Sequence, residues 1–102
     1  SISLVDYSRW YYNLQINIFT MNTSMKKQDI ARRNKLLAEI GNRLAKQRNL
    51  LGVSQEELAD KADLDRTYIS GIERGKRNIS VFTLKKISDA LGIEIHTLLQ
   101  DK

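Results

Sequence analysis

The sequence predicts an all-α fold of five helices with a short appended arm at the N-terminus. Three observations support this prediction. Apolar residues recur at helical spacing from Asp29 onward, Ser and Asp residues stand where helices start, and glycines follow where helices end. The 102 residues contain no proline, and this length suits one domain with a single core.

The first predicted helix is long and is followed by a short one. Its apolar face comprises Ile30, Leu37, Ile40, Leu44 and Leu51. Gly52 is expected to end it, since glycine readily adopts the left-handed conformation found after helices. Ser54 and Glu57 have the spacing of a capping box, which predicts that a second helix starts at Gln55.

A turn of three or four residues is predicted to lead into a third helix. Asp65 is its expected N-cap, and the helix should run to about Arg74, where Gly75 can end it. Ser80 caps a predicted fourth helix that Gly92 ends, and a last short helix follows. This order of elements predicts a helix-turn-helix between the second and third helices.

Residues 1–24 differ in character from residues 25–102, and we predict a boundary between them. The first segment holds five of the seven aromatic residues but only two charged residues, and Leu14, Ile16 and Ile18 alternate with polar residues as in a short strand. One interpretation is an appended extension, vector-derived or translated from upstream of the usual start. The other is an arm that pairs with a second subunit or covers the core.

The composition favours a polyanionic partner and an intracellular location. Seventeen Lys and Arg against twelve Asp and Glu give a net charge of +5. The absence of cysteine excludes a disulfide framework and a thiolate metal site. There is no apolar run of membrane-spanning length and no secretory signal pattern, so we expect a cytoplasmic protein without a membrane partner.

No constellation of residues predicts catalysis. His96 stands alone and is expected at the surface or at a helix end. The adjacent Glu56 and Glu57 suit the first turn of a helix, where they complement its dipole, and side chains one residue apart do not converge on a substrate. No phosphate-cradling loop or nucleophile elbow is present. We therefore expect neither an enzyme nor a cofactor or small-molecule ligand.

The outward face of the third helix suits the major groove of DNA. Ile69 and Ile72 are expected to face the core. The opposite face then carries Arg66, Thr67, Ser70, Gly71 and Arg74. Arg can donate two hydrogen bonds to guanine, Thr and Ser can contact bases or phosphates, and a bare Gly71 allows close approach. An ordinary solvated face is the alternative, but the turn before the helix and the basic loop after it favour DNA.

Glu73 is predicted to point at least partly inward, because it lies four residues after Ile69. A buried carboxylate is costly unless it is paired. Glu73 therefore requires a cation from another part of the chain.

The stretch SQEELADKADLDRTYISGIERGKRNIS, residues 54–80, resembles the helix-turn-helix family of Cro and the phage repressors, the xenobiotic-response-element type. Within it, LDRTYISGIER is similar to the controller proteins of restriction-modification operons. The resemblance covers residues 36–100 and implies a lambda-repressor-like DNA-binding domain. Gly71 departs from the phage repressors, which carry a long base-reading side chain there, so base reading should rest more on Arg66 and Arg77.

The resemblance also implies roles for individual residues. Gln55 should bond a phosphate, Arg66, Thr67 and Ser70 should make most base or adjacent phosphate contacts, and Arg77 and Asn78 should touch the backbone or a base edge. The predicted DNA-binding residues are Gln55, Arg66, Thr67, Tyr68, Ser70, Arg74, Lys76, Arg77 and Asn78. Arg48 falls where the family places the partner of the inward glutamate, here Glu73. Ahead of the core, Lys26, Lys27, Arg32, Arg33 and Lys35 form a basic cluster that either grips phosphate or is a solvated helix start.

The expected function is sequence-specific DNA binding as a homodimer that regulates transcription, as the controller of a restriction-modification operon. One module buries a small interface, so specificity calls for a pseudo-palindromic operator with half-sites about 34 Å apart. The dimer surface is expected among Ile79, Val81, Phe82, Ile93, Ile95, Leu98 and Leu99. Two alternatives stay open: an antitoxin that binds its own operator, and a protein-interaction module whose N-terminal aromatic residues dock a partner.

Overall fold

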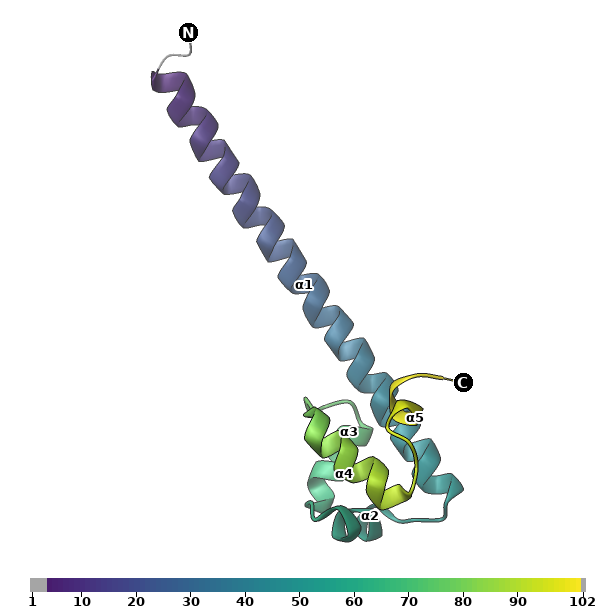
Figure 1. The fold of residues 1–102 in the computed structure, drawn as a ribbon. Coiled ribbons are helices and arrows are strands. Elements are labelled where there is room, and N and C mark those ends of the chain that lie inside the picture. The colour runs from purple at the N-terminus through teal and green to yellow at the C-terminus, as the bar shows by residue number, and fades with distance from the viewer. Residues whose placement is uncertain (1–3, 102) are drawn as a thin grey trace. The chain divides into compact units, whose positions relative to one another are not determined.

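The computed structural model describes the backbone of residues 4–101 and the side chains of residues 6–17 and 26–101. The described residues form five helices and no strand, which confirms the all-α prediction (Figure 1). The helices are α1 (Leu4–Leu50), α2 (Gln55–Ala62), α3 (Arg66–Glu73), α4 (Val81–Leu91) and α5 (His96–Leu99). In this part of the chain no helix combines the length and hydropathy needed to cross a membrane.

The predicted short strand around Leu14, Ile16 and Ile18 is wrong, because α1 runs through these positions. A strand needs a partner for its backbone hydrogen bonds, whereas a helix satisfies them within the segment. The segment contains no proline or glycine that would interrupt a helix. The first helix accordingly begins at Leu4 and not near Asp29.

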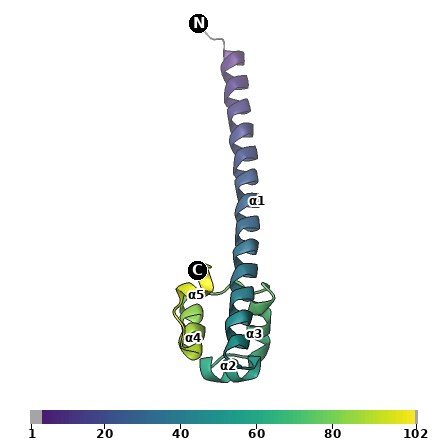
Figure 2. The same ribbon diagram turned by 90° about the vertical axis from the view of Figure 1, so that its right-hand side faces the viewer.

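The chain forms two compact units, an N-terminal unit (Ser1–Arg33) and a C-terminal unit (Asn34–Lys102). Helix α1 contributes residues to both. In the N-terminal unit every described side chain is exposed. In the C-terminal unit, α2 to α5 gather beside the last turns of α1 (Figures 1 and 2). The hydrophobic core therefore lies in the C-terminal unit.

The core is built from the apolar faces of all five helices. Its buried members are Ile40, Leu44, Leu58, Ala59, Ala62, Ile69, Ile72, Leu84, Ile87, Leu91 and Leu98. Of the face predicted for the first helix, Ile40 and Leu44 are buried, whereas Ile30 and Leu51 are exposed. Ile30 lies in the N-terminal unit, and Leu51 lies beyond the last turn of α1.

The predicted caps define where α2, α3 and α4 start. The Ser54 hydroxyl accepts a hydrogen bond from the Glu57 N–H at 3.0 Å, which is the first bond of the expected capping box. The Asp65 carboxylate accepts from the Thr67 N–H at 2.7 Å, and Ser80 accepts from the Thr83 N–H at 3.1 Å. Each cap satisfies an N–H that has no partner inside its helix, which fixes the residue at which the helix begins.

Helices α1 and α3 approach each other at two glycines. A Cβ atom on Gly41 would lie 2.4 Å from the Ile72 carbonyl oxygen and 2.6 Å from that of Glu73. Gly75, at φ +71°, ends α3, and a Cβ there would lie 3.0 Å from the Ala38 Cα. These contacts bring the end of α3 directly against the α1 backbone.

Candidate nucleic-acid interface

The turn between α2 and α3 consists of residues 63–65, at the short end of the predicted length. Asp63 adopts the left-handed conformation at φ 53°, which Asp tolerates better than most residues. The Asp63 N–H donates to the Asp60 carbonyl at 3.3 Å, and the Leu64 N–H donates to the Ala59 carbonyl at 2.9 Å. These bonds close the end of α2, so the next residue, Asp65, can cap α3 at once.

The first turn of α3 faces solvent. Ile69 and Ile72 are buried as predicted, while Arg66 and Thr67 are exposed and Ser70 is half-buried. Asp65 also accepts a short hydrogen bond from the Thr67 hydroxyl. Hydrogen bonds from the Thr67 side chain and N–H lower the pKa of Asp65 below its ordinary value. The ionised cap therefore holds the start of α3 in one geometry, with Arg66 directly after it.

Gly71 does not leave a bare patch on α3, so that prediction is wrong. Gly71 is buried, and a Cβ atom there would lie 2.9 Å from Cγ of Arg77. The Arg77 guanidinium also lies 5.7 Å from the centre of the Tyr68 ring, within cation–π distance. The missing side chain of Gly71 thus admits Arg77, which reaches back from the loop onto α3.

Arg48 and Glu73 form the ion pair that Glu73 requires. Arg48 Nε lies 2.7 Å from Glu73 Oε2, and Arg48 Nη2 lies 2.9 Å from Oε1, so the contact is bidentate. The third arm of the guanidinium donates to the Val53 carbonyl at 2.9 Å. The Glu73 side chain is 8% exposed and that of Arg48 is 13% exposed. Hydrogen bonding to Glu73 raises the pKa of Arg48.

Gln55 joins this pair to the start of α2. Its Nε2 donates to Glu73 Oε1 at 3.2 Å. A hollow of about 450 Å³ beside it is lined by Arg48, Ser54, Gln55, Glu56 and Arg66. The side chain expected to bond a phosphate and the one expected to read a base therefore border the same open space, above a buried ion pair.

The other predicted contact residues follow α3 closely in space and sequence. Arg74, Lys76, Arg77 and Asn78 are exposed, and Tyr68 is half-buried with its ring packed on the core. Arg74 Nε donates to the Ser70 carbonyl at 3.3 Å, which holds this side chain along the helix. Four cations thus lie within or just after α3, while the nearby charge of Glu73 is neutralised by Arg48.

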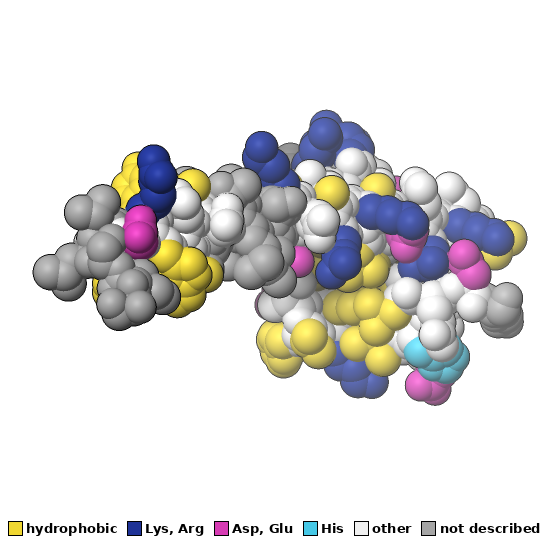
Figure 3. Space-filling model, turned by 90° about the horizontal axis from the view of Figure 1, so that it is seen from above, with side chains coloured by type: hydrophobic (Ala, Val, Ile, Leu, Met, Phe, Trp, Pro, Cys, Tyr) yellow, Lys and Arg dark blue, Asp and Glu magenta, His cyan; other side chains and the backbone are white. Residues whose placement is uncertain are grey.

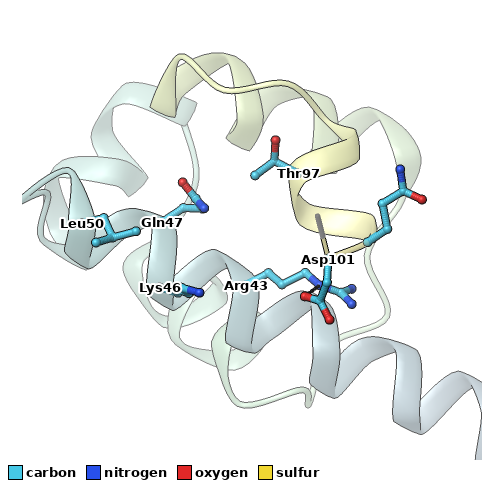
Figure 4. Close-up of a pocket in the computed structure, with 7 residues that line it drawn as sticks. Arg43, Lys46, Gln47, Leu50, Thr97 and Asp101 are labelled. Atoms are coloured by element: carbon cyan, nitrogen blue, oxygen red, sulfur yellow. Dashed lines mark hydrogen bonds and ion pairs between the residues drawn. The ribbon is translucent and has the colours of Figure 1, made fainter.

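A second cavity, of about 460 Å³, lies away from this surface, between the end of α1 and the C-terminal segment (Figure 4). Its lining includes Arg43, Lys46 and Thr97, and Arg43 Nε donates to Asp101 at 3.1 Å. That bond lowers the pKa of the Asp101 carboxyl and raises that of Arg43. The Asp101 side chain is 87% exposed, so this contact is a surface pair that tethers the C-terminal segment.

The apolar residues proposed for dimerisation separate into two groups. Leu98 is fully buried, and Ile79, Ile93 and Ile95 pack against the core. Val81, Phe82 and Leu99 remain exposed, at 77%, 73% and 41% respectively. A dimer contact in this part of the chain would therefore involve Val81, Phe82 and Leu99.

The comparisons with known proteins agree with this geometry. A family model described as helix-turn-helix matches residues 44–98. The control protein C.MunI of Mycoplasma sp is 48% identical over 69 residues, which cover 67% of this chain and 93% of that protein. The crystal structure of the restriction-modification controller protein C.AhdI from Aeromonas hydrophila matches with a TM-score of 0.60 and 45% identity, over 61% of this chain and 94% of that one.

A structure solved with nucleic acid is also similar. The crystal structure of SinR, a master regulator for biofilm formation, in complex with DNA matches with a TM-score of 0.57 and 42% identity, over 60% of this chain and 98% of that one. These matches confirm the resemblance to repressors and controller proteins. The match covers more than half of the chain and includes the turn, α3 and the Arg48–Glu73 pair. The chain therefore belongs to the helix-turn-helix family.

Proposed function

We propose that this chain is a sequence-specific DNA-binding regulator of transcription, the controller of a restriction-modification operon, and that it binds a pseudo-palindromic operator as a homodimer. The observation that carries the proposal is the exposed first turn of α3, held by a three-residue turn and flanked by exposed cations. The similarity to C.MunI and C.AhdI, which are named as controller proteins, supports the controller assignment. The similarity to SinR, solved with DNA, supports the ligand.

Base recognition is assigned to the first turns of α3. Arg66 is exposed directly after the Asp65 cap, where a recognition helix brings side chains to base edges. A guanidinium can donate two hydrogen bonds to O6 and N7 of guanine, which discriminates this base from the others. Thr67 and Ser70, three residues apart on the same face of α3, are assigned to neighbouring bases or phosphates. Arg77, packed over Gly71, extends this reading surface.

Phosphate contacts are assigned to the residues around α3. Lys76, exposed in the loop after Gly75, supplies an ammonium donor, and Gln55, half-buried at the start of α2, has a second N–H on the Nε2 that donates to Glu73. Arg74 and Asn78 are exposed in the same stretch. Such contacts set the position of α3 in the groove but carry no base preference, and they make affinity depend on salt.

The homodimer is assigned to the exposed apolar residues Val81, Phe82 and Leu99. One module of this size cannot bury enough DNA surface for high specificity, and two modules about one helical turn apart can. Phe82→Glu should lower the affinity for a two-half-site duplex, and in a chain that begins at Met25 it should also lower the dimer fraction. Titration with one-half-site and two-half-site duplexes and sedimentation equilibrium would measure the two effects.

The test compares Arg66→Ala with Lys76→Ala on an operator obtained by selection from random duplexes. Arg66→Ala should lose about 1–3 kcal/mol on the operator and relax the preference at one base pair per half-site. Lys76→Ala should weaken operator and random DNA equally and flatten the slope of log affinity against log salt by about one unit. Lys61→Ala, which removes an exposed cation at the far end of α2, is the matched control.

Two outcomes would contradict the assignment. If Arg66→Ala weakened every duplex equally, Arg66 would be a phosphate clamp, and base reading would fall to Thr67, Ser70, Arg77 or DNA shape. If selection enriched no duplex and Lys61→Ala matched Lys76→Ala at all salt concentrations, the basic surface would bind polyanions without specificity.

A further inference from the structure

The N-terminal unit presents uncovered aromatic side chains. Tyr7, Trp10, Tyr11 and Tyr12 are 52–65% exposed, and Leu14 is 38% exposed. Figure 3 shows hydrophobic groups at the surface of this unit. An isolated helix gains most of its stability from packing one face against a partner. All the described side chains of this unit are exposed, so its apolar residues are available for such packing.

In the helical conformation, three of these residues lie along one face, which we call the seam. Tyr7, Tyr11 and Leu14 are spaced by four and three residues, so they share one face of α1. In the sequence the same alternation of three and four continues to apolar residues at positions 4, 18, 21 and 25. It stops at position 28, which is Gln, and position 32, which is Arg. Seven successive apolar positions at this spacing are the a and d pattern of a coiled coil.

We propose that the N-terminal unit pairs with the N-terminal unit of a second copy of this chain as a two-stranded coiled coil, with Tyr7, Tyr11 and Leu14 in the seam. This contact is separate from the Val81, Phe82 and Leu99 surface and needs no DNA. It goes beyond the proposed function, since a helix-turn-helix that binds no operator could pair in the same way.

The charges of the segment are compatible with pairing between identical chains. Asp6 and Arg9 are the two charged residues among positions 1–25, they sum to zero, and neither lies at a seam position. Two copies therefore do not repel each other along the seam. Trp10 flanks the seam, and its ring centre lies 6.2 Å from that of Tyr7. It can shield the edge of the contact from water.

The described seam residues offer apolar area for a contact between two helices. A buried aromatic side chain removes about 150–250 Å² from water, and the half-exposed rings of Tyr7 and Tyr11 can bury roughly 100 Å² each. Tyr7, Tyr11 and Leu14 on two helices together give roughly 500 Å², about half of the approximately 1,000 Å² expected of a specific interface. In the sequence, the apolar residues at positions 4, 18, 21 and 25 follow the same spacing, so the pattern is long enough for a contact beyond these three residues.

A lipid surface fits the segment less well than a second copy does. Helices that lie in a membrane interface carry many Lys and Arg residues opposite their apolar face. Here Arg9 is the single basic residue opposite the seam, and the other basic residues begin at Lys26, after the seam has ended. The charge distribution thus favours a second copy of this helix over a lipid surface as the binding partner.

Single cysteines in the full-length chain test the contact directly, because the chain has no cysteine of its own. Leu14→Cys lies in the middle of the seam, which meets itself whether the helices run parallel or antiparallel. Asn13→Cys, one residue away and about 100° around the helix, is the control. Under mild oxidation Leu14→Cys should form a covalent dimer at least about tenfold faster, because pairing raises the effective concentration of the two thiols. Equal rates would overturn the proposal.

A second pair of variants identifies the face. Added to Leu14→Cys, Tyr11→Glu should slow cross-linking at least about tenfold, because it buries unpaired carboxylates in the seam. Tyr12→Glu, the same change off the seam, should leave the rate within about twofold. If the two variants had equal effects, the seam would not be the contact.

Two further arms separate this proposal from its rivals. Cross-linking of Leu14→Cys should persist in the Phe82→Glu background, and loss of cross-linking there would show that the C-terminal surface alone brings the chains together. Vesicles of phosphatidylserine and phosphatidylcholine are added to the cysteine-free chain and to Tyr11→Glu. Vesicle binding that depends on Tyr11, together with equal cross-linking of Leu14→Cys and Asn13→Cys, would overturn the proposal in favour of a membrane surface.

Discussion

Removing the Glu73 carboxylate should destabilise the C-terminal unit more than removing the carboxylate of any exposed ion pair in that unit. In Glu73→Ala, Arg48 Nε and Nη2 and Gln55 Nε2 all lose their acceptor. Arg48 keeps its bond to the Val53 carbonyl, but its side chain is only 13% exposed, so water replaces the lost acceptors poorly. The guanidinium stays charged, because no change of pH within the stable range deprotonates Arg.

The magnitude follows from this geometry. Breaking a buried pair by removing one partner costs about 3–5 kcal/mol, since the remaining charge is uncompensated. The retained bond to Val53 and the partial exposure of Arg48 argue for the lower end, about 3 kcal/mol. In a domain of about 60–100 residues each kcal/mol lowers Tm by about 4–8 °C, so the expected fall is roughly 12–24 °C.

Urea unfolding followed by circular dichroism, together with calorimetry, would measure the loss. Tryptophan fluorescence is unsuitable because Trp10 lies in the N-terminal unit. Asp89→Ala is the matched control: it removes an exposed carboxylate that lies 3.0 Å from Lys85 and should change stability far less. Arg48→Met combined with Glu73→Leu should recover part of the loss, because no unpaired charge remains. A loss below about 1 kcal/mol in Glu73→Ala would refute the reasoning and show that water satisfies Arg48.

The remaining predictions concern backbone contact, the α3 cap and the N-terminal segment. Gly41→Ala should cost at least about 1–3 kcal/mol in urea unfolding, because its Cβ would overlap the α3 carbonyls, whereas Asn42→Ala should stay within about 0.5 kcal/mol. In thermal melts between pH 2 and 7, the wild type should lose stability relative to Asp65→Asn as pH falls below about 3.9, since ionised Asp65 stabilises the fold only above its lowered folded-state pKa; a constant difference would contradict this. Gly71→Ala should change the free energy of unfolding by less than about 1 kcal/mol, because the higher helix propensity of alanine offsets the displacement of Arg77 by the new Cβ atom. The same variant should alter base preference in a binding selection, since Arg77 moves. A chain that begins at Met25 should keep the base preference of the full chain, as all assigned contact residues follow it; lost preference would show that residues 1–24 contact or position DNA.

Local chemistry in the sequence determined most of the C-terminal unit. Capping, helix ends and the spacing of apolar residues depend on neighbours within a few positions, so Ser54, Asp65 and Ser80 predicted the starts of three helices. The outward position of Arg66 followed from helical geometry once Ile69 was assigned to the core. The need of Glu73 for a cation also followed from its position, although its partner Arg48 came from the resemblance.

In the N-terminal segment the local sequence pattern predicted the wrong secondary structure. The alternation at Leu14, Ile16 and Ile18 suits a strand, but a strand is stable only beside another strand, and residues 4–101 contain none. As a helix the same residues present a different face, on which Tyr7, Tyr11 and Leu14 align. The choice between the two periods depends on long-range partners, which a short window of sequence does not contain.

Composition and spacing by themselves determined an all-α, basic chain with a helix-turn-helix and a polar outward face on its third helix. Only the tertiary structure decided that Arg77 fills the space over Gly71, that Gln55 completes the Arg48–Glu73 pair, and that Gly41 lets α3 touch the α1 backbone. Each of these contacts joins residues from different helices or loops. Their distances depend on how whole elements pack, and close packing is a property of the assembled core that no local pattern encodes.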